Sequence, residues 1–389
     1  MDHRNDMTDE TTDYTQVSDG STAQVSEELM VATQWQLMWW KFKRHKLAVG
    51  AGIVLLAMIA AAVFADVITP YNPRQRHSGY VFAPPTRPRF ISEDGFQLRP
   101  FVYGLEREID LATGRRVFEI DTDRRYELQL FVRGEPYRMW NLIEWDVHLF
   151  GTRDPDGKVF LLGTDSMGRD LFTQILFGAR ASISIALLGV LLSVTLGLII
   201  GGVAGYFGGV IDNVVQRLSE VLMSFPSIPL WMALAAALPR EWGPLQVYIG
   251  IVVILSVVGW TSLGRQIRSK ILSVKTEDFV IAARVNGAST GRLLRVHLIP
   301  SVMSHIIASL SLSIPGMIIA ETALSFIGIG LMRPVISWGV LLQQAQQLRA
   351  LMFSPWLLTP GIFVVITVLA FNFVGDGLRD AADPYSSLV

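Results

Sequence analysis

The chain contains an unbroken apolar run, Leu47–Ala65, that includes no charged side chain. At a rise of 1.5 Å per residue, a helix of this length crosses roughly 30 Å of hydrocarbon. Lipid cannot satisfy backbone N–H and C=O groups, so a run of this kind restricts the local fold to a helix. The run is preceded by four basic residues, Lys41, Lys43, Arg44 and Lys46. Under the positive-inside rule, this flank predicts a cytoplasmic N-terminus.

Five further apolar runs follow the first. They cover Ala181–Tyr206, Val221–Leu238, Leu245–Leu263, Val302–Ala320 and Leu357–Val374. Hydrophobic residues make up 51% of the chain and charged residues only 17%, which is unlike a soluble domain. We therefore predict an all-α membrane protein with six transmembrane helices and both termini in the cytoplasm. The third span is the weakest of the six, because Pro226 and Pro229 interrupt it.

The composition shifts along the chain predict four regions. Residues 1–35 form a polar, acidic tail that we expect to be disordered, and residues 36–68 carry the first span with its basic flank. Residues 69–162 form an extracytoplasmic insert. Residues 163–385 form a core of five spans, with a cytoplasmic segment at 275–300. The chain has no cysteine, which excludes disulfides and thiolate metal sites.

The insert shows strand-like patterns. Apolar and polar residues alternate from Tyr126 to Val132. A hairpin is predicted between Val147–Phe150 and Val159–Leu162, around the turn signal Asp154–Gly157. These patterns favour a small β-rich extracytoplasmic module between the first two spans, and an irregular linker is the alternative.

Glycine recurs every four residues along the second span, at Gly197, Gly201, Gly205 and Gly209. Such a face lets another helix backbone approach closely, which predicts static packing. The alternative is a smooth face that slides during transport.

Glu321 lies at the outer end of the fifth span, where an ionisable side chain is costly. We expect it to orient the following loop, and direct contact with a substrate is the alternative.

The cytoplasmic segment between Arg265 and Pro300 is too patterned for a simple connector. A helix is predicted to start at Asp278, and Gly287 ends or bends it. The small side chains of Ala282 and Ala283 leave a shallow helix surface that a groove on another protein could accept. A helix lying on anionic lipid fits the pattern equally well, because basic residues lie within it and shortly after it. These are Arg284, Arg292 and Arg295.

Several catalytic motifs are missing from the sequence. There is no G-x-x-x-x-G-K-[ST] loop for ATP, no H-E-x-x-H and no G-x-S-x-G. The spans contain almost no acidic, histidine or lysine side chain near their centres, which a carrier driven by protons or sodium usually needs. The chain is therefore not expected to supply its own energy.

The stretch Glu277–Ala288, followed by Arg295–Pro300, resembles the EAA coupling motif of ATP-binding-cassette (ABC) transporter permeases. More narrowly, it is similar to the C-type subunit of the dipeptide/oligopeptide/nickel permease family. A second motif of that family is matched before the second span by Gly163, Thr164, Asp165, Gly168, Arg169 and Asp170. Two features depart from the family pattern. Ile281 stands where the motif has glutamate, and the insert at about 85–160 has no counterpart in plain family members.

The resemblance implies a type I ABC importer permease fold in a bacterial inner membrane, forming half of a pore for peptides. It implies a second permease subunit, an extracytoplasmic solute-binding protein and two ABC ATPase subunits that hold ATP and magnesium. On this chain it implies no cofactor, no metal, no catalytic residue and no nucleic-acid partner. The residues that would couple to the ATPases are Asp278, Ala282, Ala283, Arg284, Gly287 and Pro300.

The resemblance leaves the cargo open. Oligosaccharide import by the same architecture is the alternative to peptides, and nickel is less favoured because the chain has no cysteine and six histidines. In other functional classes, a stand-alone channel or secondary carrier, or a membrane scaffold without transport, remain as alternatives.

Overall fold

The computed structural model describes residues 34–92, 95–110, 115–140 and 142–382. The predicted disordered tail therefore lies almost entirely outside the described residues. Within the described ranges, five helices are long and apolar enough to cross a membrane. They are α3 (Lys46–Val63), α5 (Leu171–Phe207), α8 (Pro244–Val274), α11 (Ile299–Ile327) and α14 (Thr359–Ala382). A mostly helical, multi-pass membrane protein is confirmed.

The third predicted span, Val221–Leu238, is not one helix. α6 (Gly209–Ser224) and α7 (Ser227–Ala236) are bent by 92° relative to each other, and they count as a sixth span only if the bent pair is taken as one. The sequence correctly indicates an interruption at Pro226, and the predicted count of six spans holds only if the bent pair is one span. Pro226 forces the preceding residue out of the helical conformation, and Phe225 accordingly has φ −86° and ψ 139°.

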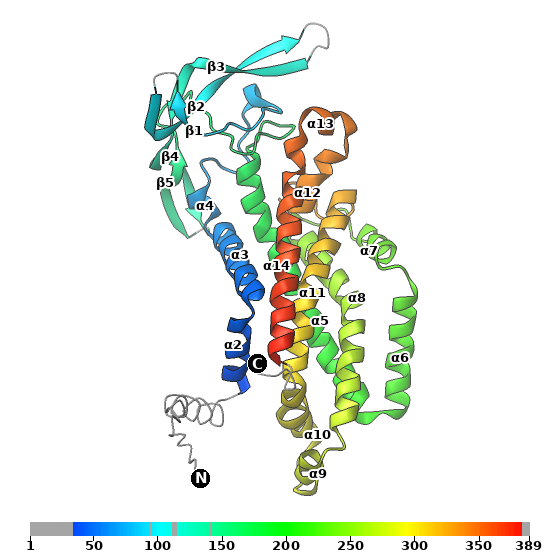
Figure 1. Cartoon of the computed structure of the whole chain (residues 1–389). Helices are drawn as coiled ribbons and strands as arrows, with labels where there is room; N and C mark the ends of the chain where they lie inside the picture. The colour runs from blue at the N-terminus through cyan, green and yellow to red at the C-terminus, as the bar shows by residue number, and fades with distance from the viewer. Residues whose placement is uncertain (1–33, 93–94, 111–114, 141, 383–389) are drawn as a thin grey trace, which may run out of the picture.

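The helices form an elongated bundle in which α5 packs along α8, α11 along α14, and α14 on α3 (Figure 1). α5 and α8 are longer than the predicted spans, because each continues as a regular helix beyond the purely apolar part of its sequence. Short helices complete the bundle at its ends. They are α2 (Gln34–Arg44), α4 (Ala65–Ile68), η1 (Ser78–Tyr80), α12 (Trp338–Gln343), η3 (Gln344–Gln346), α13 (Leu348–Phe353) and η4 (Pro355–Leu358).

Three glycines of α5 lie against the backbone of α8. A Cβ atom added at Gly201 would lie 2.3 Å from the carbonyl oxygen of Gly264, and one at Gly205 would lie 2.9 Å from that of Arg268. At Gly197 the distance to the Gly264 nitrogen would be 3.2 Å. Gly209 does not share this contact. It follows the end of α5 with φ +58°, and a Cβ there would meet no atom within 4 Å.

Replacing Gly201 with alanine is expected to destabilise the protein by about 1–3 kcal/mol, because the new methyl group overlaps the α8 backbone and the two helices have to separate. Gly50→Ala is the matched control, since Gly50 is exposed on α3 and a Cβ there meets nothing within 4 Å. The measurement is the thermal unfolding midpoint of the detergent-purified chain. Equal midpoints for the two variants would show that the α5–α8 contact is not tight.

The segment between α3 and α5 is a small β-rich module, which confirms the module and excludes the irregular linker. One antiparallel sheet has the order β1-β2-β3, and β4 pairs with β5 in a second sheet. The strands are β1 (Arg89–Ser92), β2 (Gly95–Asp110), β3 (Arg115–Glu127), β4 (Gln129–Met139) and β5 (Ile143–Gly151). The alternation seen around Leu128 is thus split between two strands.

The predicted hairpin has the wrong partner. Val147–Phe150 does lie in a strand, but β5 pairs with the preceding β4, with Gln129 opposite Gly151 and Met139 opposite Ile143. Val159–Leu162 forms no strand. Its apolar residues are consecutive and do not alternate, and Val159 and Phe160 are buried instead. The Asp154–Gly157 turn is present, with the Gly157 N–H donating to the Asp154 carbonyl at 3.1 Å.

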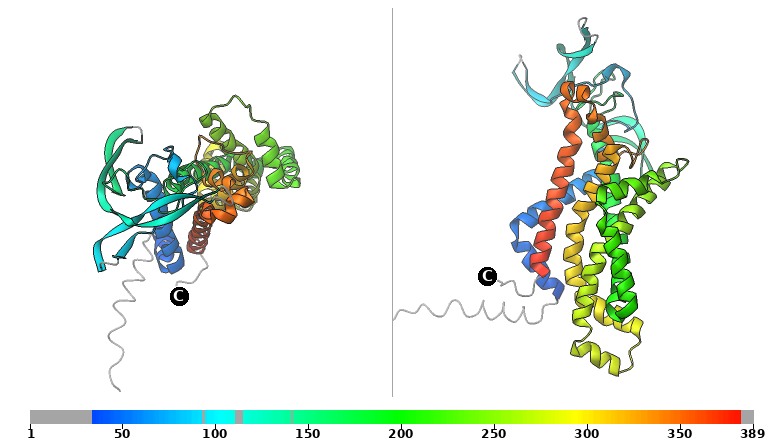
Figure 2. Two further views of the ribbon diagram at one scale, coloured as in Figure 1. Left: turned by 90° about the horizontal axis from the view of Figure 1, so that it is seen from above. Right: turned by 90° about the vertical axis from the view of Figure 1, so that its right-hand side faces the viewer.

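The module and α9 (Asp278–Val285) lie at opposite ends of the bundle (Figure 1). We call these the module end and the α9 end. α2 and the last turn of α14 lie towards the α9 end (Figure 1). The right-hand view in Figure 2, which is turned by 90° about the vertical axis, shows the same arrangement.

Candidate functional site

The segment that joins α8 to α11 projects beyond the bundle at the α9 end (Figure 1). It contains α9, the single turn α10 (Thr290–Arg292) and η2 (Leu293–Leu298), a π-helical stretch that runs directly into α11. α9 carries Asp278 in its first turn and Arg284 in its last, and both charges complement the helix dipole. Pro300 lies in the first turn of α11, directly after the π-helical stretch η2.

A Schellman motif closes α9. The Gly287 N–H donates to the Arg284 carbonyl at 3.0 Å, and the Ala288 N–H donates to the Ala283 carbonyl at 3.1 Å. Gly287 has φ +78°, a left-handed conformation that glycine adopts without steric cost. The side chains of Ala283 and Ala288 both pack against the main hydrophobic core. The end of α9 is therefore fixed in position.

The exposed surface of α9 is mostly apolar, with one charged residue near each end. Val280 is fully buried, whereas Phe279, Ile281 and Val285 are 46%, 47% and 81% exposed. Asp278, Ala282, Arg284, Gly287 and Pro300 are also exposed, and Ala283 is half-buried. The structure thus brings the predicted residues of this segment onto one projecting surface, apart from Pro300, which starts the next helix. Ile281, which departs from the family motif, is part of the exposed face.

Contacts at the base of the segment tie it to α5 and α6. The Arg284 guanidinium lies 5.9 Å from the centre of the Tyr206 ring, and Lys275 Nζ donates to the Gly205 carbonyl at 3.2 Å. Arg268 forms an ion pair with Asp212, with 2.5 Å between Nη2 and Oδ2. A displacement of α9 would therefore reach α5 through these contacts and α11 through η2. Sequence reasoning missed these contacts, because nothing local in the sequence marks Gly205, Tyr206 and Asp212 as neighbours of this end of α8 and the segment that follows it.

The second motif, at the module end, surrounds the fully buried carboxylate of Asp165. Its Oδ1 accepts from the Met167 and Arg169 N–H groups at 2.8 and 2.9 Å. Its Oδ2 accepts from Arg169 Nε at 2.8 Å, and from Arg333 Nη2 and Gln174 Nε2 at 3.2 Å each. One carboxylate thereby joins the start of α5 to the loop after α11.

The remaining motif residues complete this cluster. Gly168 has φ +72°, and a Cβ there would lie 2.1 Å from the His77 carbonyl oxygen. Gly163 has φ +76°, and the Thr164 hydroxyl accepts from the Ala83 N–H at 2.8 Å. Asp170 caps α5 by accepting from the Thr173 N–H at 2.8 Å. Burial raises the pKa of Asp170 to about 7, although the bonds from Thr173 lower it.

Glu321 is also fully buried and contacts two serines. Its carboxylate accepts from Ser182 Oγ at 3.0 Å and from Ser325 Oγ at 2.9 Å. Those hydroxyls in turn accept from the Trp338 and Leu331 N–H groups, at 3.1 and 3.0 Å. Glu321 therefore holds the loop after α11 through its serine neighbours. This geometry favours the loop-orienting interpretation over substrate contact.

α8 carries a polar face in its half nearest the α9 end. An open hollow of about 520 Å³ is lined by Ser262, Arg265, Gln266, Ser269 and Lys270. Ser309 of α11 donates to Gln266 Oε1 at 2.9 Å. Charged side chains on a spanning helix are unfavourable against lipid, so this face is suited to water or to another protein.

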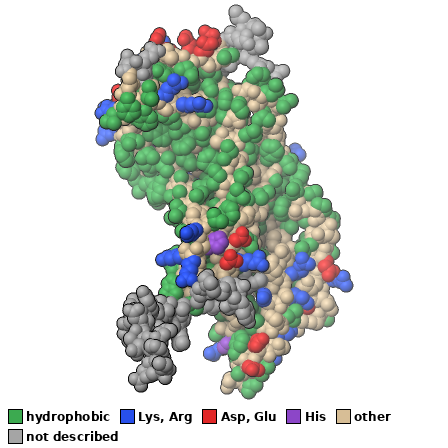
Figure 3. All heavy atoms as spheres, in the orientation of Figure 1, with side chains coloured by type: hydrophobic (Ala, Val, Ile, Leu, Met, Phe, Trp, Pro, Cys, Tyr) green, Lys and Arg blue, Asp and Glu red, His purple; other side chains and the backbone are tan. Residues whose placement is uncertain are grey.

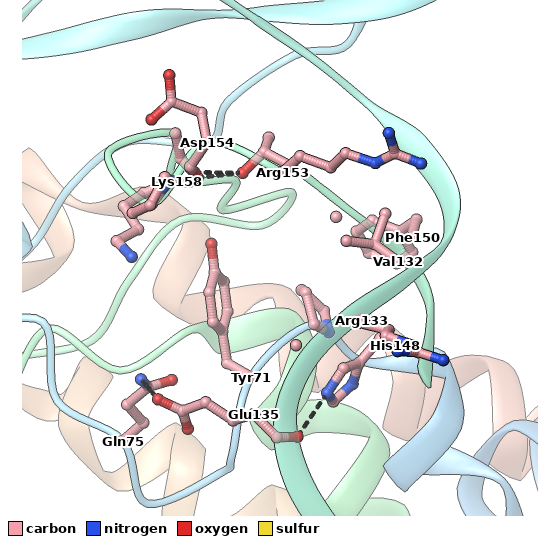
Figure 4. Close-up of a pocket in the computed structure, with 16 residues that line it drawn as sticks. Tyr71, Gln75, Val132, Arg133, Glu135, His148, Phe150, Arg153, Asp154 and Lys158 are labelled. Atoms are coloured by element: carbon pink, nitrogen blue, oxygen red, sulfur yellow. Dashed lines mark hydrogen bonds between the residues drawn. The ribbon is translucent and has the colours of Figure 1, made fainter. Parts of the chain in front are cut away.

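A cavity of about 330 Å³ lies between the β-rich module and the loop after α4 (Figure 4). His148 is buried beside it, with its ring nitrogens 2.5 Å from the Thr69 oxygen and 3.0 Å from the Glu135 oxygen. The charged ends of Arg153 and Lys158 point in opposite directions, so the visible charges do not converge on a ligand. Across the described part of the chain, no cluster of His, Asp and Glu could hold a metal ion.

Comparison with known proteins identifies two matched regions. Residues 193–386 match the family "Binding-protein-dependent transport system inner membrane component", and residues 33–85 match the "N-terminal TM domain of oligopeptide transport permease C". The residues between the two matches, 86–192, contain strands β1 to β5, so the sheets of the β-rich module lie outside both matches.

Two relatives illustrate the similarity. The oligopeptide transport system permease protein OppC of Bacillus subtilis (strain 168) is 35% identical over 238 residues, covering 61% of this chain and 75% of that protein. OppC of Salmonella typhimurium is 44% identical over 223 residues, covering 57% and 71%. Among solved structures, an amino acid ABC transporter aligns at 18% identity over 54% of this chain and 94% of that one. Its TM-score of 0.40 is too low to support a finer assignment.

Proposed function

Because this chain belongs to the binding-protein-dependent transport system inner membrane components, we propose that it forms half of the pore of a peptide importer. The chain is a membrane permease and not an enzyme, since ATP hydrolysis in this family lies on separate subunits. Its relatives are named for oligopeptide and dipeptide transport, which supports peptides as the cargo. We assign it the type I ABC importer permease fold.

The exposed face of α9 is the observation that supports this proposal most strongly. It projects from the bundle, presents apolar and small side chains, and is closed by a fixed Schellman turn. Such a surface fits a cleft on an ATPase subunit. Two ATPases would dock in the assembled importer, one on this chain and one on a second permease subunit. ATP and magnesium would be bound by the ATPases, with no cofactor on this chain.

The contacts at the base of α9 suggest how force is transmitted. When ATP closes the two ATPases, α9 moves with its cleft. The Arg284–Tyr206 and Lys275–Gly205 contacts pass this displacement to α5, and η2 passes it to α11. The pore then alternates between inward-open and outward-open states, with ATP as the ligand that biases this two-state equilibrium from the partner.

The arrangement of the two ends supports an orientation. If α9 meets the ATPases in the cytoplasm, the β-rich module at the opposite end is extracytoplasmic (Figure 1). α2 and the end of α14 lie on the α9 side, so both termini are assigned to the cytoplasm of a bacterium whose inner membrane holds the spans. A solute-binding protein would deliver cargo at the module end.

Reconstitution tests the proposed function. The chain is purified with the subunits that accompany it and placed in liposomes with a peptide-loaded binding protein. We expect labelled pentapeptide to accumulate only when ATP is supplied to the ATPase side. Equal accumulation of a labelled maltooligosaccharide would overturn the peptide assignment. Uptake by this chain alone, without ATPase subunits, would show a stand-alone carrier and contradict the importer.

A further inference from the structure

The turn between β4 and β5 carries a group of exposed apolar side chains. Trp140, Leu142, Ile143 and Trp145 are 47%, 81%, 49% and 47% exposed. We call these four residues the hairpin tip. Exposed apolar clusters on an otherwise charged hairpin indicate a contact with another apolar phase, because their burial removes unfavourable contact with water.

Direct contacts place the hairpin tip beside the end of the first span. Trp140 Nε1 donates to the carbonyl oxygen of Val63, the last residue of α3, at 3.1 Å. The Trp140 and Phe64 rings lie 6.0 Å apart. Arg180 of α5 donates to the same Val63 oxygen at 2.9 Å and to Asp66 at 2.6 Å. Charged and indole donors thus gather where α3 leaves the apolar part of the bundle, the level at which a membrane interface begins.

The surface leading from α3 to the hairpin tip is apolar. Ile53 and Leu56 of α3 are 64% and 70% exposed, and Phe64, which follows the last residue of α3, is 45% exposed. Figure 3 shows hydrophobic side chains covering the edge of the module that faces the spans, whereas Lys and Arg gather mainly at the α9 end. The tip therefore continues the surface that the first span presents to lipid.

Charge near the tip fits a headgroup layer. Arg138 and Glu144 are opposite each other on β4 and β5, one pair back from the Met139–Ile143 pair next to the turn. Arg138 Nε donates to Glu144 Oε1 at 2.7 Å, and both side chains are more than two-thirds exposed. Tryptophan is enriched at membrane interfaces, where its ring is in apolar surroundings and its N–H finds a polar partner.

We propose that the hairpin tip inserts into the interface of the lipid leaflet at the module end, and so anchors the β-rich module to the membrane beside α3. The anchor holds the module at a set height over the first span. It depends on the spans lying in a bilayer and is independent of the cargo and of the ATPases. Leu98 on β2, which is also exposed, lies outside the hairpin tip and is not part of the anchor.

Depth measurement with single spin labels tests the anchor. The chain has no cysteine, so Leu142→Cys and Ile143→Cys each give one labelling site in the full-length protein. Leu98→Cys is the matched control, because Leu98 is 88% exposed on the same module. The protein, with the subunits that accompany it, is placed in nanodiscs. Collision of each nitroxide with oxygen and with a polar nickel chelate is then measured.

We expect the ratio of oxygen to nickel collisions at 142 and 143 to exceed that at 98 by roughly tenfold, because the polar reagent is excluded from lipid and oxygen is enriched there. Equal ratios at 142 and 98 would place the tip in water and overturn the proposal. A label at 142 that neither reagent reaches would show that protein covers the tip, which also overturns it. Since no uptake is measured, failure of the anchor and failure of the importer assignment are distinguishable.

Discussion

Replacing Gly287 with tryptophan is expected to abolish ATP-driven uptake while the chain remains folded in the membrane. A Cβ at Gly287 would meet no atom of this chain within 4 Å, so the added side chain projects into open space next to Val285. In the proposed importer that space belongs to the ATPase cleft. The indole would block docking, and the φ of +78° would add about 1–2 kcal/mol of local strain.

A second glycine separates these two effects. Gly209 has φ +58°, and its Cβ would also meet no atom within 4 Å, but it lies at the start of α6 and outside the α9 surface. Gly209→Trp therefore bears a similar backbone cost without obstructing α9. Gly287→Asn is the complementary variant, because asparagine tolerates the left-handed conformation. Its smaller side chain is expected to reduce uptake less than tryptophan does.

The measurements are peptide uptake in proteoliposomes and the amount of ATPase that co-purifies with each variant. Gly287→Trp should lose both, whereas Gly209→Trp should keep the co-purifying ATPase. Normal uptake by Gly287→Trp would contradict docking at this turn. Equal loss in the two tryptophan variants would assign the effect to backbone strain alone.

The membrane-spanning architecture could be predicted from the sequence because the signal is a sum over many residues. To recognise Leu47–Ala65 and the later apolar runs as spans, only the length and the average polarity of each run are needed. Pro226 and Pro229 mark an interruption in the sequence, but the angle of the bend does not follow from such an average. A hydropathy average treats Val221–Leu238 as one segment, whereas one missing N–H and one extended residue at 225 divide it.

Strand pairing and side-chain contacts depend on residues that are far apart in the sequence, so local sequence patterns predict them less well. The turn signal at Asp154–Gly157 is real, but β5 pairs with β4, which precedes it. In the candidate site, the α9 helix and its Gly287 end follow from local rules of capping. The contacts of Arg284 with Tyr206 and of Lys275 with Gly205 do not, because they depend on how α5 and α8 pack.

Replacing Asp165 with alanine is expected to cause the largest loss of stability, about 3–5 kcal/mol. The change leaves Arg169 and Arg333 without their shared carboxylate, and a buried charge that loses its partner is strongly destabilising. The Arg169 side chain is only 9% exposed and Asp165 is fully buried, so water has little access to the Arg169 guanidinium once the carboxylate is removed. Asp165→Asn keeps one oxygen that can accept from both the Met167 and Arg169 N–H groups and should lose less.

Glu220→Gln provides the matched control. It breaks the Arg217–Glu220 pair, in which the side chains are 83% and 54% exposed, and surface pairs of this kind contribute little. The measurement is the thermal unfolding midpoint of each purified variant. If Asp165→Ala unfolds at the same temperature as Glu220→Gln, the buried cluster does not hold α5 to the loop after α11. Together with the Gly287 series, this experiment distinguishes two motifs at opposite ends of the bundle. Asp165→Ala should lower the unfolding midpoint at any ATP concentration, whereas the main effect of Gly287→Trp should be the loss of ATPase docking and uptake.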